Sequence, residues 1–200
     1  MTATPERSSI RGQQRERVLL AALAEIADRG PEVRVKDIAD RAGMSAGHVL
    51  YYFGSKDRIL LETLRMSEDD LVTKLSHELT RLHTPWSRVK RVVERYLAVG
   101  PGDSRWNLWA QALARTPHSA EDLALLDRLE RAWRPLLEQA VADGVADRTF
   151  RPVDAHLVTE RTTYLMDGVC MDVLMGTPGR DRAWAVRFVL ESLDAELRGG

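Results

Sequence analysis

Residues 35–56 read VKDIADRAGMSAGHVLYYFGSK, and this segment predicts two short helices joined by a tight turn. Apolar residues recur at helical spacing from Val35 to Ala42, and Gly43 ends that pattern. Ser45 is placed to cap the second helix. A glycine-containing turn of this length lets the second helix cross the first steeply and project outward. The segment therefore predicts a helix-turn-helix whose second helix enters the major groove of duplex DNA.

The second helix of this segment has an inner and an outer face. Val49 and Phe53 are expected to pack inward, against the preceding helices. Small residues at positions 46 and 47 permit close approach to base edges, and the rings of His48 and Tyr51 can donate hydrogen bonds to bases or phosphates. The residues expected to face DNA are Ser45, Ala46, Gly47, His48, Tyr51 and Tyr52.

Cations around the segment are candidates for phosphate contacts. Arg34 and Lys36 stand at the start of its first helix, and Lys56 follows its second helix. Arg11 lies on the N-terminal arm, which is expected to reach an adjacent groove. Each of these cations could equally be a solvated surface charge. Because the net charge of the whole chain is only −1, a local cluster would have to hold the DNA.

The rest of the chain also reads as helix. Apolar residues recur at helical spacing between Gly- and Pro-containing breaks, and no alternating strand pattern occurs. One long helix is expected to start at a Ser119 cap and to continue past Pro135, which could kink it. The prediction is an all-α fold of about nine helices. A three-helix helix-turn-helix domain occupies residues 1–65, and a helical domain occupies residues 66–200.

Two motifs carry a resemblance to a known family. Residues Val35–Ser45, followed by Tyr51–Lys56, resemble the signature of the TetR family of transcriptional regulators. The resemblance covers nearly all of residues 11–65. It implies an N-terminal DNA-binding domain and a C-terminal domain that dimerises and holds a small-molecule pocket. The stretch Tyr52–Asp57, which runs into LLETLR at 60–65, is similar to the choline-sensing repressors of the betaine pathway.

Two positions depart from the family pattern. Arg34 stands where the family commonly has threonine, so a hydroxyl cap is lost at the start of that helix. Leu50 stands where the family often has tyrosine, so it is expected to meet a thymine methyl group or simply to pack. The operator sequence therefore cannot be carried over from the family.

The last two helices are expected to form a dimer. Their apolar stripe is too extensive for a solvated terminal helix. Gly168 costs about 1 kcal/mol in a helix interior relative to alanine, which close approach of another helix would justify. The alternative is that these helices pack only within one chain. The expected interface residues are Gly168, Val186, Val189, Leu190, Leu193 and Leu197.

Aromatic side chains of the middle helices suggest where a small molecule binds. Three tryptophans are expected on inward faces, and a tyrosine, a methionine and the single cysteine are expected to meet them. Such a cage suits an apolar or aromatic effector, or a quaternary ammonium through cation–π contact, although each residue could simply belong to the core. The candidate ligand-binding residues are Tyr96, Trp106, Trp109, Leu113, Trp133, Met166 and Cys170.

Several other functions have no support in the sequence. The single cysteine excludes an internal disulfide, neither His118 nor His156 has a partner at metal-ligand spacing, and no nucleophile, base and orienting group suggest catalysis. We therefore expect no cofactor, no metal and no enzyme activity. No apolar run approaches the length of a membrane span, and Met1–Arg17 lacks the apolar core of a signal peptide, so a cytoplasmic location is expected.

The sequence thus favours a homodimeric repressor that binds a near-palindromic operator and is released by a small-molecule effector. Two-fold symmetry would place its two recognition helices about 34–36 Å apart. The alternatives are an activator, a regulator without an effector and, from other classes, an all-α enzyme or an interaction scaffold.

Overall fold

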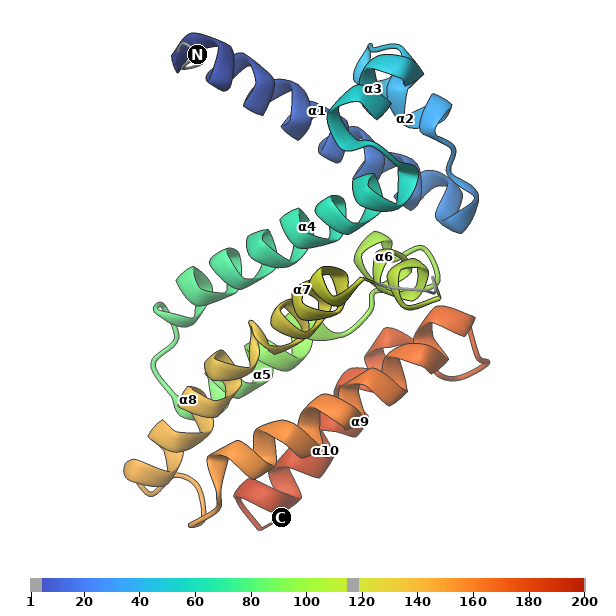
Figure 1. Cartoon of the computed structure of the whole chain (residues 1–200). Helices are drawn as coiled ribbons and strands as arrows, with labels where there is room; N and C mark the ends of the chain where they lie inside the picture. Colours follow the sequence, from blue (N-terminus) through green and yellow to red (C-terminus); the bar gives the residue numbers. More distant parts are fainter. Residues whose placement is uncertain (1–4, 115–118, 200) are drawn as a thin grey trace. The chain divides into compact units, whose positions relative to one another are not determined.

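A computed structural model describes residues 5–114 and 119–199 (Figure 1). The described residues form ten α-helices and one 3₁₀ turn, and none of them is in a β-strand. In chain order the elements are α1 (Pro5–Arg29), η1 (Gly30–Glu32), α2 (Val35–Ala42), α3 (Ala46–Phe53), α4 (Lys56–Leu79), α5 (Pro85–Tyr96), α6 (Ser104–Leu113), α7 (Ala120–Arg131), α8 (Arg134–Ala146), α9 (Ala155–Met175) and α10 (Arg182–Leu197). None of the described helices is long and apolar enough to cross a membrane.

The predicted all-α class is confirmed, and one predicted helix is divided in two. The long helix expected after Ser119 stops at Arg131, and α8 begins at Arg134. Pro135 lies in the first turn of α8, where a proline is tolerated because its missing N–H needs no partner there. The chain therefore breaks just before Pro135 instead of kinking around it.

The chain divides into two compact units that are not contiguous in sequence. The first comprises residues 1–67 and 102–117, and the second comprises residues 68–101 and 118–200. α6 belongs to the first unit, where it contacts α1 and η1. The second unit thus differs from the C-terminal domain predicted at residues 66–200, because it lacks the segment that contains α6.

The core of the first unit is built from short amphipathic helices around α1. α1 contributes an apolar stripe with a period of three to four residues, as expected for a helix that faces a core. α2 and α3 each add a few apolar side chains, and the first half of α4 closes the cluster. The fully buried side chains include Val18, Ala22, Ile26, Ile38, Val49, Ile59 and Leu64. Burial of each of the larger ones stabilises the fold by about 1.5–3 kcal/mol.

Ion pairs brace α2 against α1 in the same unit. Glu25 of α1 is almost fully buried, yet it accepts a hydrogen bond from Arg41 of α2 at 2.6 Å and pairs with Arg29 at 2.9 Å. Arg41 also pairs with Asp28. A buried carboxylate is costly unless it is paired, so these arginines allow Glu25 to sit between the two helices.

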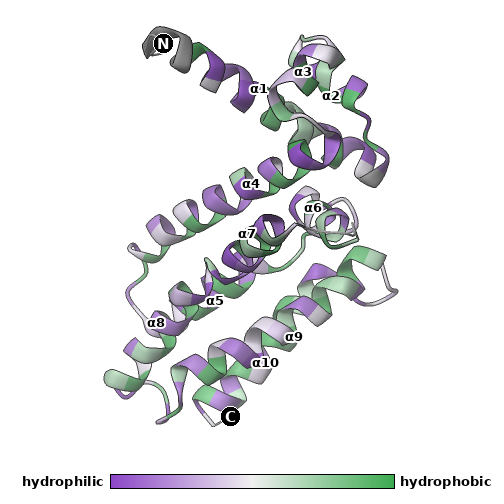
Figure 2. Ribbon diagram, in the orientation of Figure 1, coloured by the Kyte–Doolittle hydropathy of each residue, from purple (hydrophilic) through white to green (hydrophobic). Residues whose placement is uncertain are grey.

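The second unit contains a bundle of α5, α8, α9 and α10. α5 contacts α8 and α10, and α9 contacts α8 and α10. Hydrophilic and hydrophobic positions alternate along these helices, as Figure 2 shows for α9 and α10. The fully buried side chains include Val89, Val92, Val93, Leu137, Val141, Met166, Val189 and Leu197.

One position of this bundle permits no side chain. A Cβ built on Gly144 of α8 would lie 2.1 Å from Cδ2 of Phe150, which is far inside van der Waals contact. The backbone N–H of Phe150 donates to the carbonyl of Gly144 at 2.8 Å, so the chain folds back tightly here. Phe150 is buried, and Gly144 provides the space for its ring.

Candidate nucleic-acid interface and effector-binding residues

The two helices predicted from residues 35–56 are present, and local chemistry fixes their ends. α2 ends at Gly43, whose φ of 63° is left-handed and suits glycine. α3 begins after Ser45, whose hydroxyl accepts a hydrogen bond from the N–H of His48 at 3.2 Å. At the start of α2, the carboxylate of Asp37 accepts from the N–H of Arg34 at 3.1 Å. Asp37 thus partly compensates for the hydroxyl cap that Arg34 lacks.

α3 presents one face to its own unit and leaves the other uncovered. Val49 and Phe53 are buried and anchor the helix. Ser45, Gly47 and His48 are exposed, and Tyr51 is 76% exposed. Leu50 is also exposed, so it is free to meet a ligand instead of packing inside. The two remaining predicted residues, Ala46 and Tyr52, are half-buried.

Polar rings cluster on this uncovered face. His48 and Tyr52 lie with their ring centroids 5.0 Å apart, and Tyr51 meets Tyr52 edge-on at 5.7 Å. The guanidinium of Arg11 lies 5.9 Å from the centroid of the Tyr52 ring. Ile10, Arg11, Tyr51 and Tyr52 line a hollow of about 250 Å³ between α1 and α3.

The predicted cations lie around α3, with one correction. Arg34 and Lys36 are exposed at the start of α2, and Lys56 is half-buried in the first turn of α4. Arg11 is exposed, but it does not lie on an extended arm, because α1 is helical from Pro5 onward. Its position beside α3 is therefore set by the helix and not by a free segment.

The second unit brings part of the predicted ligand cage together. Tyr96 and Trp133 are buried with their ring centroids 4.3 Å apart. The hydroxyl of Tyr96 donates to Asp167 of α9 at 2.6 Å. Met166 is fully buried, and the sulfur of Cys170 accepts from the N–H of Ala98 at 3.3 Å. Four of the seven predicted residues therefore contribute to the interior of this unit.

Two polar groups in this interior were missed by the sequence analysis. Asp167 lies directly after Met166 in α9, and a carboxyl group within an apolar face was a signal that could have been used. Nε1 of Trp133 is buried and has no hydrogen-bond partner among the described residues. An unpartnered buried N–H costs about 1–3 kcal/mol, so an acceptor placed beside it would stabilise the protein.

The other three predicted residues belong to α6 in the first unit. Trp106 is buried and Trp109 is half-buried, but Leu113 is 62% exposed. The buried face of α6 includes Leu108 and Ala112, which are also spaced at helical intervals. The predicted apolar face of this helix was therefore partly rotated about the helix axis from the face that is buried. A shared pocket of these residues with Tyr96 and Trp133 stays a prediction.

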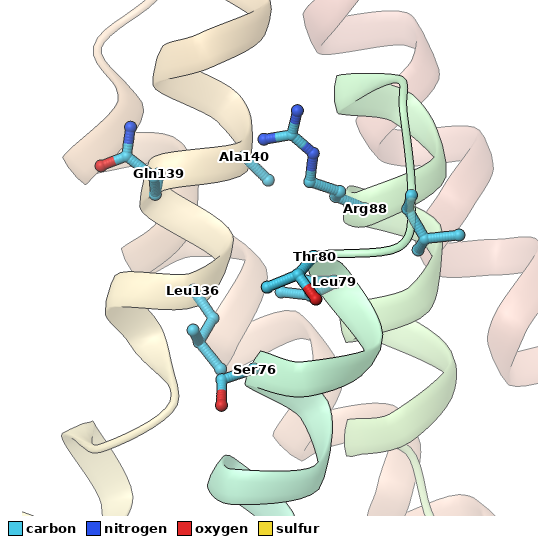
Figure 3. Close-up of a pocket in the computed structure, with 8 residues that line it drawn as sticks. Ser76, Leu79, Thr80, Arg88, Leu136, Gln139 and Ala140 are labelled. Atoms are coloured by element: carbon cyan, nitrogen blue, oxygen red, sulfur yellow. The ribbon is translucent and has the colours of Figure 1, made fainter.

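A separate cleft of about 360 Å³ lies between the end of α4, α5 and α8 (Figure 3). In the close-up, the guanidinium of Arg88 extends toward α8 near Ala140. Arg88 pairs with Asp143, which also accepts from the amide of Gln139 at 2.7 Å. The cleft is lined by Ser76, Leu79, Thr80, Leu82, Arg88, Leu136, Gln139 and Ala140. No sequence motif pointed to it.

The predicted dimer stripe of α10 is largely an internal surface. Val189, Leu193 and Leu197 are buried in the core of the chain itself, where a partner copy cannot reach them. The prediction that these three residues form the dimer interface is therefore corrected. They pack within their own chain, which was the alternative. Val186 and Leu190 are half-buried.

Another face of α9 and α10 is apolar and exposed. Gly168 is exposed, and a Cβ at this position would meet no described atom within 4 Å, so none of the described helices approaches it. The exposed apolar residues on the same two helices are Leu157, Tyr164, Met171, Met175 and Phe188. In α9 they and Gly168 recur at intervals of three, four or seven residues, which places them on one stripe. This spacing was visible in the sequence.

Two parts of the chain match protein-family models. Residues 18–63 match the model of bacterial regulatory proteins of the tetR family. Residues 85–198, more than half of the chain, match the C-terminal model of BetI-type transcriptional repressors.

Relatives and solved structures agree with these matches. The HTH-type transcriptional regulator BetI of Brucella canis is 24% identical over 93% of this chain and 92% of its own length. BetI of Agrobacterium fabrum is 27% identical over 92% of this chain and 88% of its own. A transcriptional regulator from Saccharomonospora viridis, solved in complex with choline, superposes with a TM-score of 0.83 at 27% identity, over 93% of this chain and 98% of its own.

A more distant structure shares the fold alone. The regulator FadR of Bacillus subtilis, solved in complex with stearoyl-CoA, has a TM-score of 0.70 at 19% identity, over 89% of this chain and 96% of its own. Given a helix-turn-helix with an uncovered second helix and matches across both units, the chain belongs to the TetR family of DNA-binding transcriptional regulators, with a C-terminal region of the BetI repressor type.

Proposed function

We propose that this protein is a homodimeric repressor that binds a near-palindromic operator and leaves it when a small quaternary ammonium compound binds. The observation that carries the proposal is the uncovered face of α3, where Gly47, His48 and Tyr51 have no cover from the rest of their unit. Small residues and hydrogen-bonding rings are what a helix needs in order to approach base edges in the major groove.

We assign two roles to the residues around α3. His48, Leu50 and Tyr51 contact base edges, and Ala46 and Gly47 permit the close approach. Backbone contacts come from cations and the cap that surround the helix, namely Arg11, Arg34, Lys36, Ser45 and Lys56, with Tyr52 supporting Arg11 and His48. Phosphate contacts of this kind fix the register, whereas the base contacts carry the sequence information.

The dimer interface that we propose is the exposed apolar face of α9 and α10. It contains Leu157, Tyr164, Gly168, Met171, Met175 and Phe188. An exposed apolar stripe of this length on α9, with Phe188 exposed on the neighbouring α10, is typical of a surface that a partner covers. The absence of a side chain at Gly168 allows a helix of the partner to approach closely. A two-fold axis here would present two copies of α3 to two operator half-sites.

The effector class follows from the interior of the second unit. The paired rings of Tyr96 and Trp133 suit a quaternary ammonium group, and the carboxylate of Asp167 adds a negative charge beside them. The unpartnered N–H of Trp133 favours a ligand that also carries an oxygen acceptor. The similarity to a regulator solved with choline supports this class.

Selection of bound duplexes from a random DNA pool tests the DNA-binding half of the proposal. We expect enrichment of a near-palindrome whose half-sites are centred about one helical turn, or a multiple of it, apart. No enrichment at low salt would reject this protein as a sequence-specific regulator that works through α3.

Titration with choline tests the effector half, with tryptophan fluorescence as the binding signal and release of the selected duplex as the functional one. Asp167→Asn keeps the shape of the side chain and removes its charge, so it should weaken choline binding about tenfold or more. Asp143→Asn, beside the cleft of Figure 3, is the matched control and should bind choline normally. Choline binding without release of DNA would favour a regulator that the effector does not displace.

A further inference from the structure

One arginine of α1 touches three parts of the helix-turn-helix unit at once. Nη1 of Arg15 donates to the backbone carbonyl of Tyr52 at 2.7 Å, and Nη2 pairs with the carboxylate of Glu62 in α4. Its guanidinium carbon also lies 4.4 Å from the centroid of the Phe53 ring. The side chain of Arg15 is 30% exposed and that of Glu62 is 13% exposed. All four residues lie in the first compact unit.

The carbonyl of Tyr52 belongs to the last turn of α3. Carbonyls in the last turn of a helix lack partners within the helix, and the negative end of the helix dipole lies there. Arg15 supplies both a donor and a positive charge at this point. Ser45 caps the other end of α3, so Arg15 completes the capping and ties the C-terminal end of α3 to α1.

Glu62 holds Arg15 in place from a third helix. Its other carboxylate oxygen accepts from Nε of Arg58 at 3.1 Å, so the carboxylate bridges two arginines. The planar guanidinium of Arg15 fixes the direction of both of its hydrogen bonds, which a flexible ammonium group would not do. The contacts therefore run from Glu62 in α4, through Arg15 in α1, to the end of α3.

We infer that Arg15 and Glu62 are positioning residues for DNA recognition, which set the tilt of α3 without touching DNA. This inference rests on the proposed function, which assigns α3 as the reading helix. His48 and Tyr51 reach base edges only at the correct tilt, whereas non-specific contacts with phosphates tolerate a small rotation. Loss of either positioning residue should therefore lower operator affinity more than affinity for unrelated DNA.

The alternative role for Arg15 is a direct contact with a DNA phosphate. The salt dependence of DNA binding separates this role from the positioning role. Removing a phosphate contact weakens binding to all sequences and reduces the slope of log K against log salt by about 1. Removing a positioning residue should leave that slope unchanged. Arg11, which is exposed on the same helix and is proposed to contact phosphate, serves as the comparison.

The experiment measures binding of the full-length chain to its selected duplex and to a scrambled duplex, over a series of salt concentrations. We expect Arg15→Gln and Glu62→Gln to weaken operator binding about tenfold or more, to change scrambled-duplex binding less than about threefold, and to keep the salt slope. Arg15→Lys keeps the positive charge but loses the paired N–H donors of the guanidinium. It tests the same positioning role in a milder variant that preserves folding.

The matched control is Arg41→Gln, which breaks an ion pair of the same unit away from α3. It should lower the melting temperature while keeping operator affinity within about threefold of the wild type. The inference is overturned if the Arg15 variants weaken both duplexes equally with a shallower salt slope, or if Arg41→Gln loses operator binding to the same extent. Failure of the wild-type chain to select any duplex would instead reject the proposed function.

Discussion

The two proposed binding regions are opposite in their relation to the fold. On α3 the important side chains point away from the core, and Tyr51 is 76% exposed. In the second unit the important rings are themselves core, and Trp133 is 1% exposed. DNA is large and needs an outward surface, whereas a small molecule is held by excluding water around it. Residues that read DNA can therefore change without affecting the fold, and residues that hold the effector cannot.

The largest expected effect is on stability and comes from the buried rings of the second unit. Trp133→Ala should lower the free energy of unfolding by about 3–5 kcal/mol, because it removes a buried ring and leaves a cavity beside Tyr96. For a chain of this size the melting temperature should fall by roughly 10 °C. Thermal unfolding followed by circular dichroism measures it. A drop of only one or two degrees would mean that Trp133 is not core, and the comparison would fail.

Substitutions on the exposed face of α3 should instead lower DNA affinity and leave the stability of the fold unchanged. The double variant Tyr51→Ala with Lys56→Ala should weaken operator binding about a hundredfold, through loss of one base contact and one phosphate contact. The melting temperature should stay within about 2 °C, and the protein should remain dimeric. Fluorescence anisotropy with the selected duplex gives the affinity. Unchanged affinity would show that α3 is not the reading helix.

The exposed apolar face of α9 should be buried between the two chains of the dimer. Met171→Glu places a charge in the exposed face of α9, so it should shift the protein from dimer to monomer at micromolar concentration and lower its DNA affinity accordingly. Sedimentation velocity measures the state. Leu123→Glu, at an exposed apolar residue of α7 outside this face, should remain dimeric. A dimeric Met171→Glu variant would exclude this interface.

The smallest expected effect concerns the half-exposed ion pairs of Glu78 with Arg91 and Arg95 in the second unit. Hydrogen bonds from Arg95, and then from Arg91, hold the pKa of Glu78 below its ordinary value of 4.5, against the opposite effect of partial burial. Because the pKa is lower in the folded state, the stabilisation is present above about pH 4.5 and is lost as the pH falls through the folded value.

Glu78→Gln should therefore cost about 1 kcal/mol or less at pH 7, equivalent to about 2–4 °C in melting temperature. The difference from wild type should shrink as the pH falls below about 4.5. Melting curves from pH 3 to pH 7 measure both effects. Asp70→Asn, whose partner Lys74 is well exposed, is the comparison at pH 7 and should leave the melting temperature nearly unchanged there. A difference that does not shrink at all between about pH 4.5 and pH 3 would assign the effect to packing and not to charge.

The sequence predicted the helix-turn-helix well because its signals are local. A left-handed turn at Gly43 and a cap at Ser45 depend on a few adjacent residues, and the exposed and buried sides of α3 follow from its period. Even here the sequence could not reveal the tie between Arg15 and Tyr52. These residues are 37 positions apart, and their contact depends on how three helices pack.

The sequence predicted less where the same apolar pattern fits two different packing arrangements. Leu193 and Leu197 form an apolar stripe that looks the same whether it meets its own chain or a partner, and the structure places them inside. Trp106 and Leu113 were assigned to one face of α6, yet only the first is buried. Periodicity identifies a face of a helix, but it does not identify the neighbour that covers it.

The contact between Gly144 and Phe150 has an evolutionary consequence. Because a Cβ at position 144 would lie 2.1 Å from the ring of Phe150, the two positions cannot vary independently. A lineage that acquires alanine at 144 must already carry a smaller residue at 150, or must pass through a strained intermediate. Across homologous sequences, positions 144 and 150 should therefore covary as a pair whose combined volume is nearly constant.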